Sequence, residues 1–188
     1  MYIISFQPST SRLSLIMKKV LLAVSLLFSV SFCFSQNTVA DIEFGKTSYE
    51  EAIPKLTYRF GEPVSDDNTD RIVIFSDITY AGMKFNRAWF CFESSSSSNV
   101  FNKCWLISGF DNATDAKAFR DKIISGIEGK YDVKSEIDPQ SKFKKYYVGT
   151  SPTDPEKPFF RVSVYKEGNR QYTTVVEYGP FEYFKESF

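Results

Sequence analysis

The first 35 residues have the features of a leader, which limits the part of the chain that can belong to the folded domain. Lys18 and Lys19 form a positively charged start, and an uncharged apolar stretch follows over 20–34. The small-x-small pattern of a cleavage site then ends at Ser35. This order of charge, apolar stretch and small residues is typical of a secretory signal peptide. We therefore expect cleavage near Ser35 and a mature protein in the periplasm or outside the cell.

Two alternatives to a cleaved leader stay open. The apolar stretch has 15 residues, fewer than the roughly 20 of a membrane-spanning helix, and an uncleaved anchor is the first alternative. Lipid attachment at Cys33 is the second, although the preceding Phe32 is bulkier than the residues before a lipidated cysteine. Residues 1–16 are interpreted as an extended start of the leader or as a misassigned upstream start, with Met17 as the natural initiator.

The segment 36–188 has the usual size of one domain. Its 153 residues, which remain when 35 are removed from 188, are enough to bury a substantial core. The leader holds three cations and no acid, so 20 basic and 23 acidic residues remain of the 23 of each in the whole chain. A mildly acidic domain lacks the basic patch of a nucleic-acid-binding protein. We expect no nucleic-acid partner and, since no second apolar segment is long enough, no membrane span in the mature chain.

The chain contains no histidine. Histidine is the commonest general base and the commonest metal ligand, and its absence excludes Ser-His-Asp and Cys-His nucleophile systems. No pair of acidic residues stands at a recognisable catalytic spacing. We therefore predict that the protein is not an enzyme and uses no metal and no cofactor.

Three short segments come near to ligand-binding or catalytic motifs without meeting them. Residues 40–47, A-D-I-E-F-G-K-T, lack the first glycine of a phosphate-binding loop. Ser141 and Lys144 match S-x-x-K, but the K-T-G that accompanies it in penicillin-binding enzymes is absent. Residues 66–70 are acidic but lack the glycine and the distal glutamate of an EF-hand loop. The simpler interpretations of these segments are, in the same order, a strand-to-helix opening, a strand edge and a polar turn.

A shift of 71 residues aligns the second half of the chain with the first, without a gap over 60–110. It places Cys104 on Val175, for example, and it matches turns with turns. Each half is interpreted as one helix followed by three strands. We therefore predict two tandem units, residues 36–110 and 111–188.

Local signals define the two expected helices. Thr47 and Glu50 form a capping box at the start of the first, and Gly61 ends it. Pro54 predicts a kink or a later start. The second helix is expected from about Thr114 to Tyr131. Strands are expected over 71–75, 84–93, 100–108, 143–148, 159–166 and 171–178.

Turn signals join these strands into hairpins. Ala81-Gly82 marks one turn, Gly168-Asn169 tolerates the positive φ angles of a tight turn, and the serine run 94–98 is expected at the tip of another hairpin. Strands joined by hairpins are antiparallel, and helices must cover one face of such a sheet. The sequence thus predicts an α+β fold with two layers, built from two αβββ units and about six antiparallel strands, with both helices on one face.

Cys91 and Cys104 lie opposite each other if their hairpin is centred on Ser97-Ser98. Residues of that hairpin pair when their numbers sum to 195, and the two cysteines then form a non-hydrogen-bonded pair with Cα atoms about 4.5 Å apart. This separation suits a disulfide, and export provides an oxidising compartment. We predict a structural disulfide; two buried thiols are the alternative.

The two faces of the expected sheet differ in polarity. The face expected under the helices carries Trp89, Cys91, Cys104, Leu106, Phe160, Val162, Val164 and Val175. The opposite face is more polar in the second unit and is expected to be open. Its predicted binding residues are Phe90, Phe92, Trp105, Arg161, Tyr165 and Tyr172. Aromatic residues and arginine are enriched in protein interfaces, so we expect another protein as the partner. Contact with a carbohydrate or lipid through the same aromatics is the alternative, and burial of this face by curling or dimerisation also stays open.

The segment 41–50, D-I-E-F-G-K-T-S-Y-E, resembles a strand-to-helix opening of the form I-x-F-G-x-T-x-x-E/Q. This opening is found in the beta-lactamase inhibitor protein family and in the small outer-membrane lipoproteins of barrel assembly. The inhibitor family also uses two tandem units of a helix and an antiparallel sheet. The second unit of the present chain departs from the motif, with F-D-N-A-T at 110–114. The resemblance implies this fold and a non-enzymatic protein-binding module.

Overall fold

The computed structural model describes residues 38–67, 71–95, 98–151, 156–168 and 171–179. All of them lie in one compact unit, Gln36–Phe188, and the predicted leader with Cys33 lies outside them. Strands hold 52% of these residues and helices 21%. The predicted α+β class is therefore wrong, since the fold is nearer to all-β. Neither helix of the described ranges is long and apolar enough to cross a membrane.

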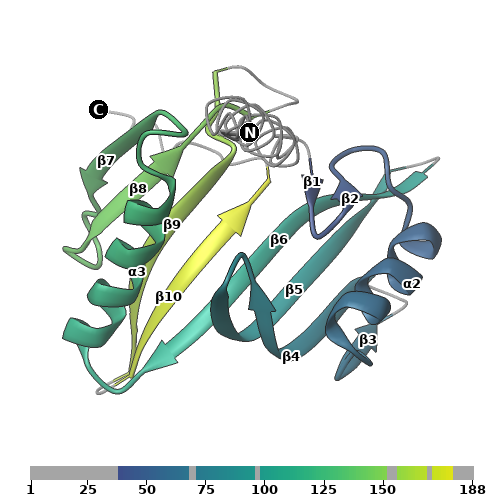
Figure 1. Ribbon diagram of the computed structural model, residues 1–188, viewed down its shortest axis with the longest axis horizontal. Coiled ribbons are helices and arrows are strands. Elements are labelled where there is room, and N and C mark those ends of the chain that lie inside the picture. Colours follow the sequence, from purple (N-terminus) through teal and green to yellow (C-terminus); the bar gives the residue numbers. More distant parts are fainter. Residues whose placement is uncertain (1–37, 68–70, 96–97, 152–155, 169–170, 180–188) are drawn as a thin grey trace, which may run out of the picture. The chain divides into compact units, whose positions relative to one another are not determined.

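One antiparallel sheet of eight strands forms the body of this unit (Figure 1). In chain order the strands are β3 (Ser65–Asp67), β4 (Ile72–Tyr80), β5 (Met83–Ser95), β6 (Ser98–Phe110), β7 (Val133–Ile137), β8 (Lys144–Val148), β9 (Phe160–Glu167) and β10 (Gln171–Tyr178). Their order in the sheet is β3-β4-β5-β6-β10-β9-β8-β7. The edge strands β3 and β7 are the two that the sequence did not predict, because they are short and rich in polar residues.

Two helices pack against the same face of the sheet, α2 (Tyr49–Phe60) on β4 and β6 and α3 (Ala113–Ile127) on β6, β9 and β10 (Figure 1). The side chain of Ser48 accepts a hydrogen bond from the N–H of Glu51, whose carboxylate accepts one from the N–H of Ser48. The capping box thus begins one residue later than predicted. Pro54 lies inside α2, which begins at Tyr49 and not after the proline.

The core between the helices and the sheet is built around aromatic rings. Phe90 of β5 is fully buried, and its ring centroid lies 6.0 Å from Phe60, 5.9 Å from Phe75 and 6.0 Å from Phe101. Phe60, whose ring centroid also lies 5.7 Å from that of Phe75, thereby packs the end of α2 against β4 and β5. Burial of each such side chain stabilises the fold by about 1.5–3 kcal/mol, so this cluster is a major source of stability.

The tip of the β4–β5 hairpin bends toward α3. Asp77 has a φ of 51°, and it interrupts the regular pairing of the two strands. Beyond this point the ring of Phe85 packs 5.7 Å from that of Phe119 in α3. Ala81 and Gly82, with φ angles of 50° and 75°, form the turn. The prediction of a turn at these two residues is confirmed.

The segment 41–50 fastens a small second sheet, β1 (Thr38–Val39) and β2 (Ile42–Glu43), to the main one. The Gly45 N–H donates to the Phe101 carbonyl, and the Phe101 N–H donates to the Thr47 carbonyl, both at 2.8 Å. Gly45 has a φ of 72°, a conformation that glycine adopts without strain. The hydroxyl of Thr47 accepts a hydrogen bond from the Glu43 N–H. Glycine and threonine in this motif therefore form the turn that leads into α2.

The order of one helix and four strands occurs twice, but the predicted residue-by-residue repeat is not supported. The shift of 71 residues matches Cys104 with Val175. Cys104 is fully buried on the side of the helices, whereas Val175 points away from them, because its neighbour Thr174 bonds to α3. Side chains alternate along a strand, so a shift that is one residue out matches opposite faces of the sheet.

Candidate binding face

The side of the sheet that faces α2 and α3 is called the helix face, and the opposite side the outer face. The structure divides the predicted binding residues between them. Phe90 and Phe92 belong to the core, with exposed fractions of 0% and 3%, whereas Trp105 lies half-buried on the outer face. Placing Phe90 and Phe92 on the open face was therefore wrong. Trp89, which was expected under the helices, lies beside Trp105.

The register of the β5–β6 hairpin explains this exchange. Ser95 pairs with Ser98, so the turn lies one residue earlier than predicted, and a bulge shifts the register between Cys91 and Phe92. Cys91 consequently lies opposite Lys103. A slip of one residue turns every side chain of a strand to the other face, which is why the predicted faces of β5 were interchanged while those of β6 from Cys104 onward were not.

The predicted disulfide is wrong, since both cysteines are free. Cys104 is buried on the helix face, and Cys91 is half-buried on the outer face. Burial raises the pKa of Cys91 to about 11, against an opposing effect of Lys103. Burial also raises the pKa of Cys104 well above its usual range. Both thiols are protonated at neutral pH and are poor nucleophiles.

The predicted binding residues of the second hairpin, β9–β10, also lie on both faces of the sheet. Arg161 and Tyr165 of β9 lie on the outer face, together with the buried Ser163 between them. Tyr172 of β10 shares the helix face with Thr174, whose hydroxyl donates to the Ala116 carbonyl of α3 at 2.9 Å. Placing Tyr172 on the open face was therefore wrong. The polar side chain of Thr174 had suggested an exposed face, but its hydroxyl is buried and satisfied by the Ala116 carbonyl.

A row of paired side chains crosses the outer face from β4 to β8. In strand order it consists of Ile74, Trp89, Trp105, Glu177, Arg161 and Tyr147. In the next row, Ile107 lies beside Val175. Both described helices lie on the other side of the sheet, so neither covers these rows (Figure 1).

Four apolar side chains lie together on the β4–β6 part of the outer face. We call Ile74, Trp89, Trp105 and Ile107 the indole patch; all four are half-buried. The two indole rings meet edge to face, with centroids 6.0 Å apart and planes at 80°. Lys103 Nζ lies 5.3 Å from the Trp105 ring centroid, within the range of a cation–π contact. Ile74, Trp89 and Ile107 were not among the predicted binding residues. A hairpin centred on residues 96 and 97, with a bulge, would have located Trp89 on this face.

The β8–β10 part of the outer face is polar and internally paired. Arg161 donates to the Glu177 carboxylate through Nε, and its Nη2 also lies 2.6 Å from the same oxygen. The Tyr147 hydroxyl donates to Glu136 at 2.6 Å. These charged and polar groups already have partners within the chain, so this part of the face has less to gain from a ligand than the indole patch.

Lys145 and Asp138 form an ion pair beside this polar part, with Nζ and Oδ2 2.6 Å apart. Burial acts to raise the pKa of Asp138, but Lys145 and the N–H groups of Ser141 and Gln140 outweigh it and lower the pKa to about 2. The Asp138 side chain also closes the β7–β8 turn, because both N–H groups donate to its Oδ1. Its role is therefore structural.

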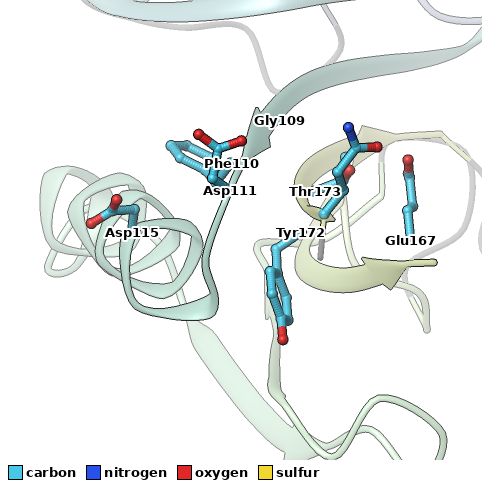
Figure 2. Close-up of a pocket in the computed structure, with 8 residues that line it drawn as sticks. Gly109, Phe110, Asp111, Asp115, Glu167, Tyr172 and Thr173 are labelled. Carbon is cyan, nitrogen blue, oxygen red and sulfur yellow. The ribbon is translucent and has the colours of Figure 1, made fainter. Parts of the chain in front are cut away.

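A pocket of about 360 Å³ lies near the start of α3 and the start of β10 (Figure 2). Its lining residues are Gly109, Phe110, Asp111, Asp115, Glu167, Gln171, Tyr172 and Thr173. Asp115 lies in the first turn of α3 and accepts a hydrogen bond from the side chain of the N-cap residue Asn112. Acidic residues are common in the first turn, because they interact favourably with the helix dipole. Within the described ranges, no cluster of metal-ligating side chains is arranged to hold an ion. The pocket is thus an acidic hollow at a helix start.

Comparisons of the chain with protein-family models, with curated proteins and with solved structures found no match. The resemblance of residues 41–50 to the beta-lactamase inhibitor protein family therefore stays a prediction.

Proposed function

We propose that this chain is an exported, non-enzymatic binding module that contacts another protein through the indole patch. The observation that carries the proposal is the position of Trp89 and Trp105 side by side on the face away from both helices. Tryptophan is strongly enriched among the residues that dominate binding energy at protein interfaces. Rings in this position contribute little to the core, and a partner that covered them would gain apolar contact area.

The surroundings of the two rings favour a protein partner over a carbohydrate. Ile74 and Ile107 flank the indoles within the sheet, and branched aliphatic side chains offer no hydrogen bonds. A sugar presents hydroxyl groups that need polar partners beside the stacking ring. An apolar centre with charged residues around it is instead the usual anatomy of a protein interface.

Export is supported by the leader pattern over 17–35, and two unpaired cysteines do not conflict with it. Cys91 and Cys104 lie on opposite faces of the sheet and cannot reach each other. Since burial keeps both thiols protonated, they are protected from oxidation in an oxidising compartment.

Replacing both indole rings tests the proposal. Trp89→Ala with Trp105→Ala should abolish capture of the partner from an envelope extract, measured by quantitative mass spectrometry. The matched control is Tyr58→Ala on α2, which removes an aromatic ring that is 95% exposed and far from the outer face in the fold. Capture should be unchanged in that control. Equal capture by the double tryptophan variant and the wild type would reject the indole patch as the binding site.

A further inference from the structure

We infer, resting on the function proposed above, that the partner presents an acidic and apolar segment to the indole patch. The inference concerns two cations, Arg87 and Lys103, that precede Trp89 and Trp105 by two residues on β5 and β6. Residues two apart on a strand share a face, so both cations border the patch.

The neighbours of these cations on the outer face do not neutralise them. Arg87 is exposed and lies between Ser76 and Ile107 in the register. Lys103 contacts the ring of Trp105. Neither forms an ion pair with a carboxylate within the described side chains.

The carboxylate nearest to the patch in the register is Glu177, which lies beside Trp105. Arg161 already holds this group with two contacts of 2.6 Å. The patch therefore has a local excess of positive charge, although the whole chain has equal numbers of acidic and basic residues.

This charge pattern selects the chemistry of the partner. A segment with large apolar side chains would cover the indoles, and carboxylates at its margins would lie close to Arg87 and Lys103. Complementary charge speeds association and fixes orientation. An uncharged segment would displace water from the two cations without offering them a carboxylate, which is unfavourable. A basic segment would be repelled.

Selection from a random linear peptide library on the immobilised protein, as recovered from the producing cell, tests the inference. The enriched peptides should combine Asp or Glu with Trp, Phe, Leu or Ile. A synthetic peptide of the enriched sequence should bind more weakly as the salt concentration rises, because exposed charges are screened.

Charge reversal gives the decisive comparison. Arg87→Glu with Lys103→Glu should weaken binding of the synthetic peptide by about tenfold or more, since the change removes two attractive ion pairs and adds repulsion. The control Lys55→Glu with Lys122→Glu makes the same change of net charge on the exposed surfaces of α2 and α3 and should leave binding within about twofold.

Enrichment of basic or uncharged peptides, preferential binding of a single-stranded oligonucleotide, or equal weakening in the control would overturn the inference. The proposed function is judged separately. Peptide binding that depends on Trp89 and Trp105 but not on Arg87 and Lys103 would keep the binding site and reject only the acidic partner.

Discussion

The helix face and the outer face of the sheet both carry large aromatic side chains, in different surroundings. Phe90 and Trp89 are adjacent in the sequence and similarly apolar. Phe90 packs against three other rings under α2 and is fully buried. Trp89 meets one ring, that of Trp105, on the side away from the helices. The contrast shows that one aromatic-rich strand can supply both a core and an aromatic surface outside it. Hydrophobicity alone does not tell which aromatic residue belongs to the core.

The largest expected effect belongs to the helix face. Phe90→Ala should lower the free energy of unfolding by about 3–5 kcal/mol, because it leaves a cavity among three rings. Trp105→Ala should cost clearly less, because the half-buried ring loses one aromatic pair contact, about 0.5–1.5 kcal/mol, and only part of its area is buried. Urea unfolding followed by circular dichroism measures both. A similar loss in the two variants would mean that the outer face is also a core, and the proposed function would fail with it.

A smaller effect is expected in the polar part of the outer face. Arg161→Ala leaves the carboxylate of Glu177 largely buried without its main partner, which should cost about 1–3 kcal/mol in the free energy of unfolding. Removing both groups in Arg161→Ala with Glu177→Ala should recover part of this loss. The double-mutant cycle from urea unfolding gives the coupling. If the two single losses simply add, the pair is not coupled and the polar part is not internally stabilised.

The pH dependence of stability sharpens the same contrast. The pKa of Asp138 is lowered in the folded protein from 3.8 to about 2. A lowered pKa means that the ion pair with Lys145 stabilises the fold above about pH 4 and that this contribution is lost as the pH falls toward 2. Between pH 4 and 2 the wild type should therefore lose more stability than Asp138→Asn. Thermal unfolding at several pH values measures the difference, and parallel curves would contradict the assignment.

The smallest effect concerns the reactivity of the two cysteines. In the native protein, alkylation at pH 8 should be slow at both residues and slower at Cys104 than at Cys91, because Cys104 is fully buried. In denaturant without a reductant, both should react, and peptide mapping by mass spectrometry identifies them. Resistance of both residues to alkylation after unfolding would indicate a disulfide. That result would require a different register from the one that separates the faces.

Several elements of the fold could be predicted from local sequence. β10 has the predicted bounds, 171–178, and the turn at Ala81-Gly82 lies where it was expected. These features depend on β-forming residues and on the turn glycine, Gly82, which tolerates positive φ, and both are properties of short segments. The two-helix, multi-strand order also follows from such signals. The N-caps were placed to within about two residues, because nearby positions offered equally good capping side chains. The second helix ends at Ile127, four residues before the predicted Tyr131.

The orientation of each strand could not be predicted in the same way. The bulge between Cys91 and Phe92 moves Trp89 to the outer face and Phe90 into the core, and the bond from Thr174 to α3 fixes Tyr172 on the helix face. Both depend on partners far away in the chain. The sequence by itself determined where the helices, the main turns and six of the eight strands of the large sheet lie, since local backbone preferences fix them. Only the tertiary structure decided which side of each strand is buried, because opposite registers satisfy the same local preferences and differ only in how the rings pack.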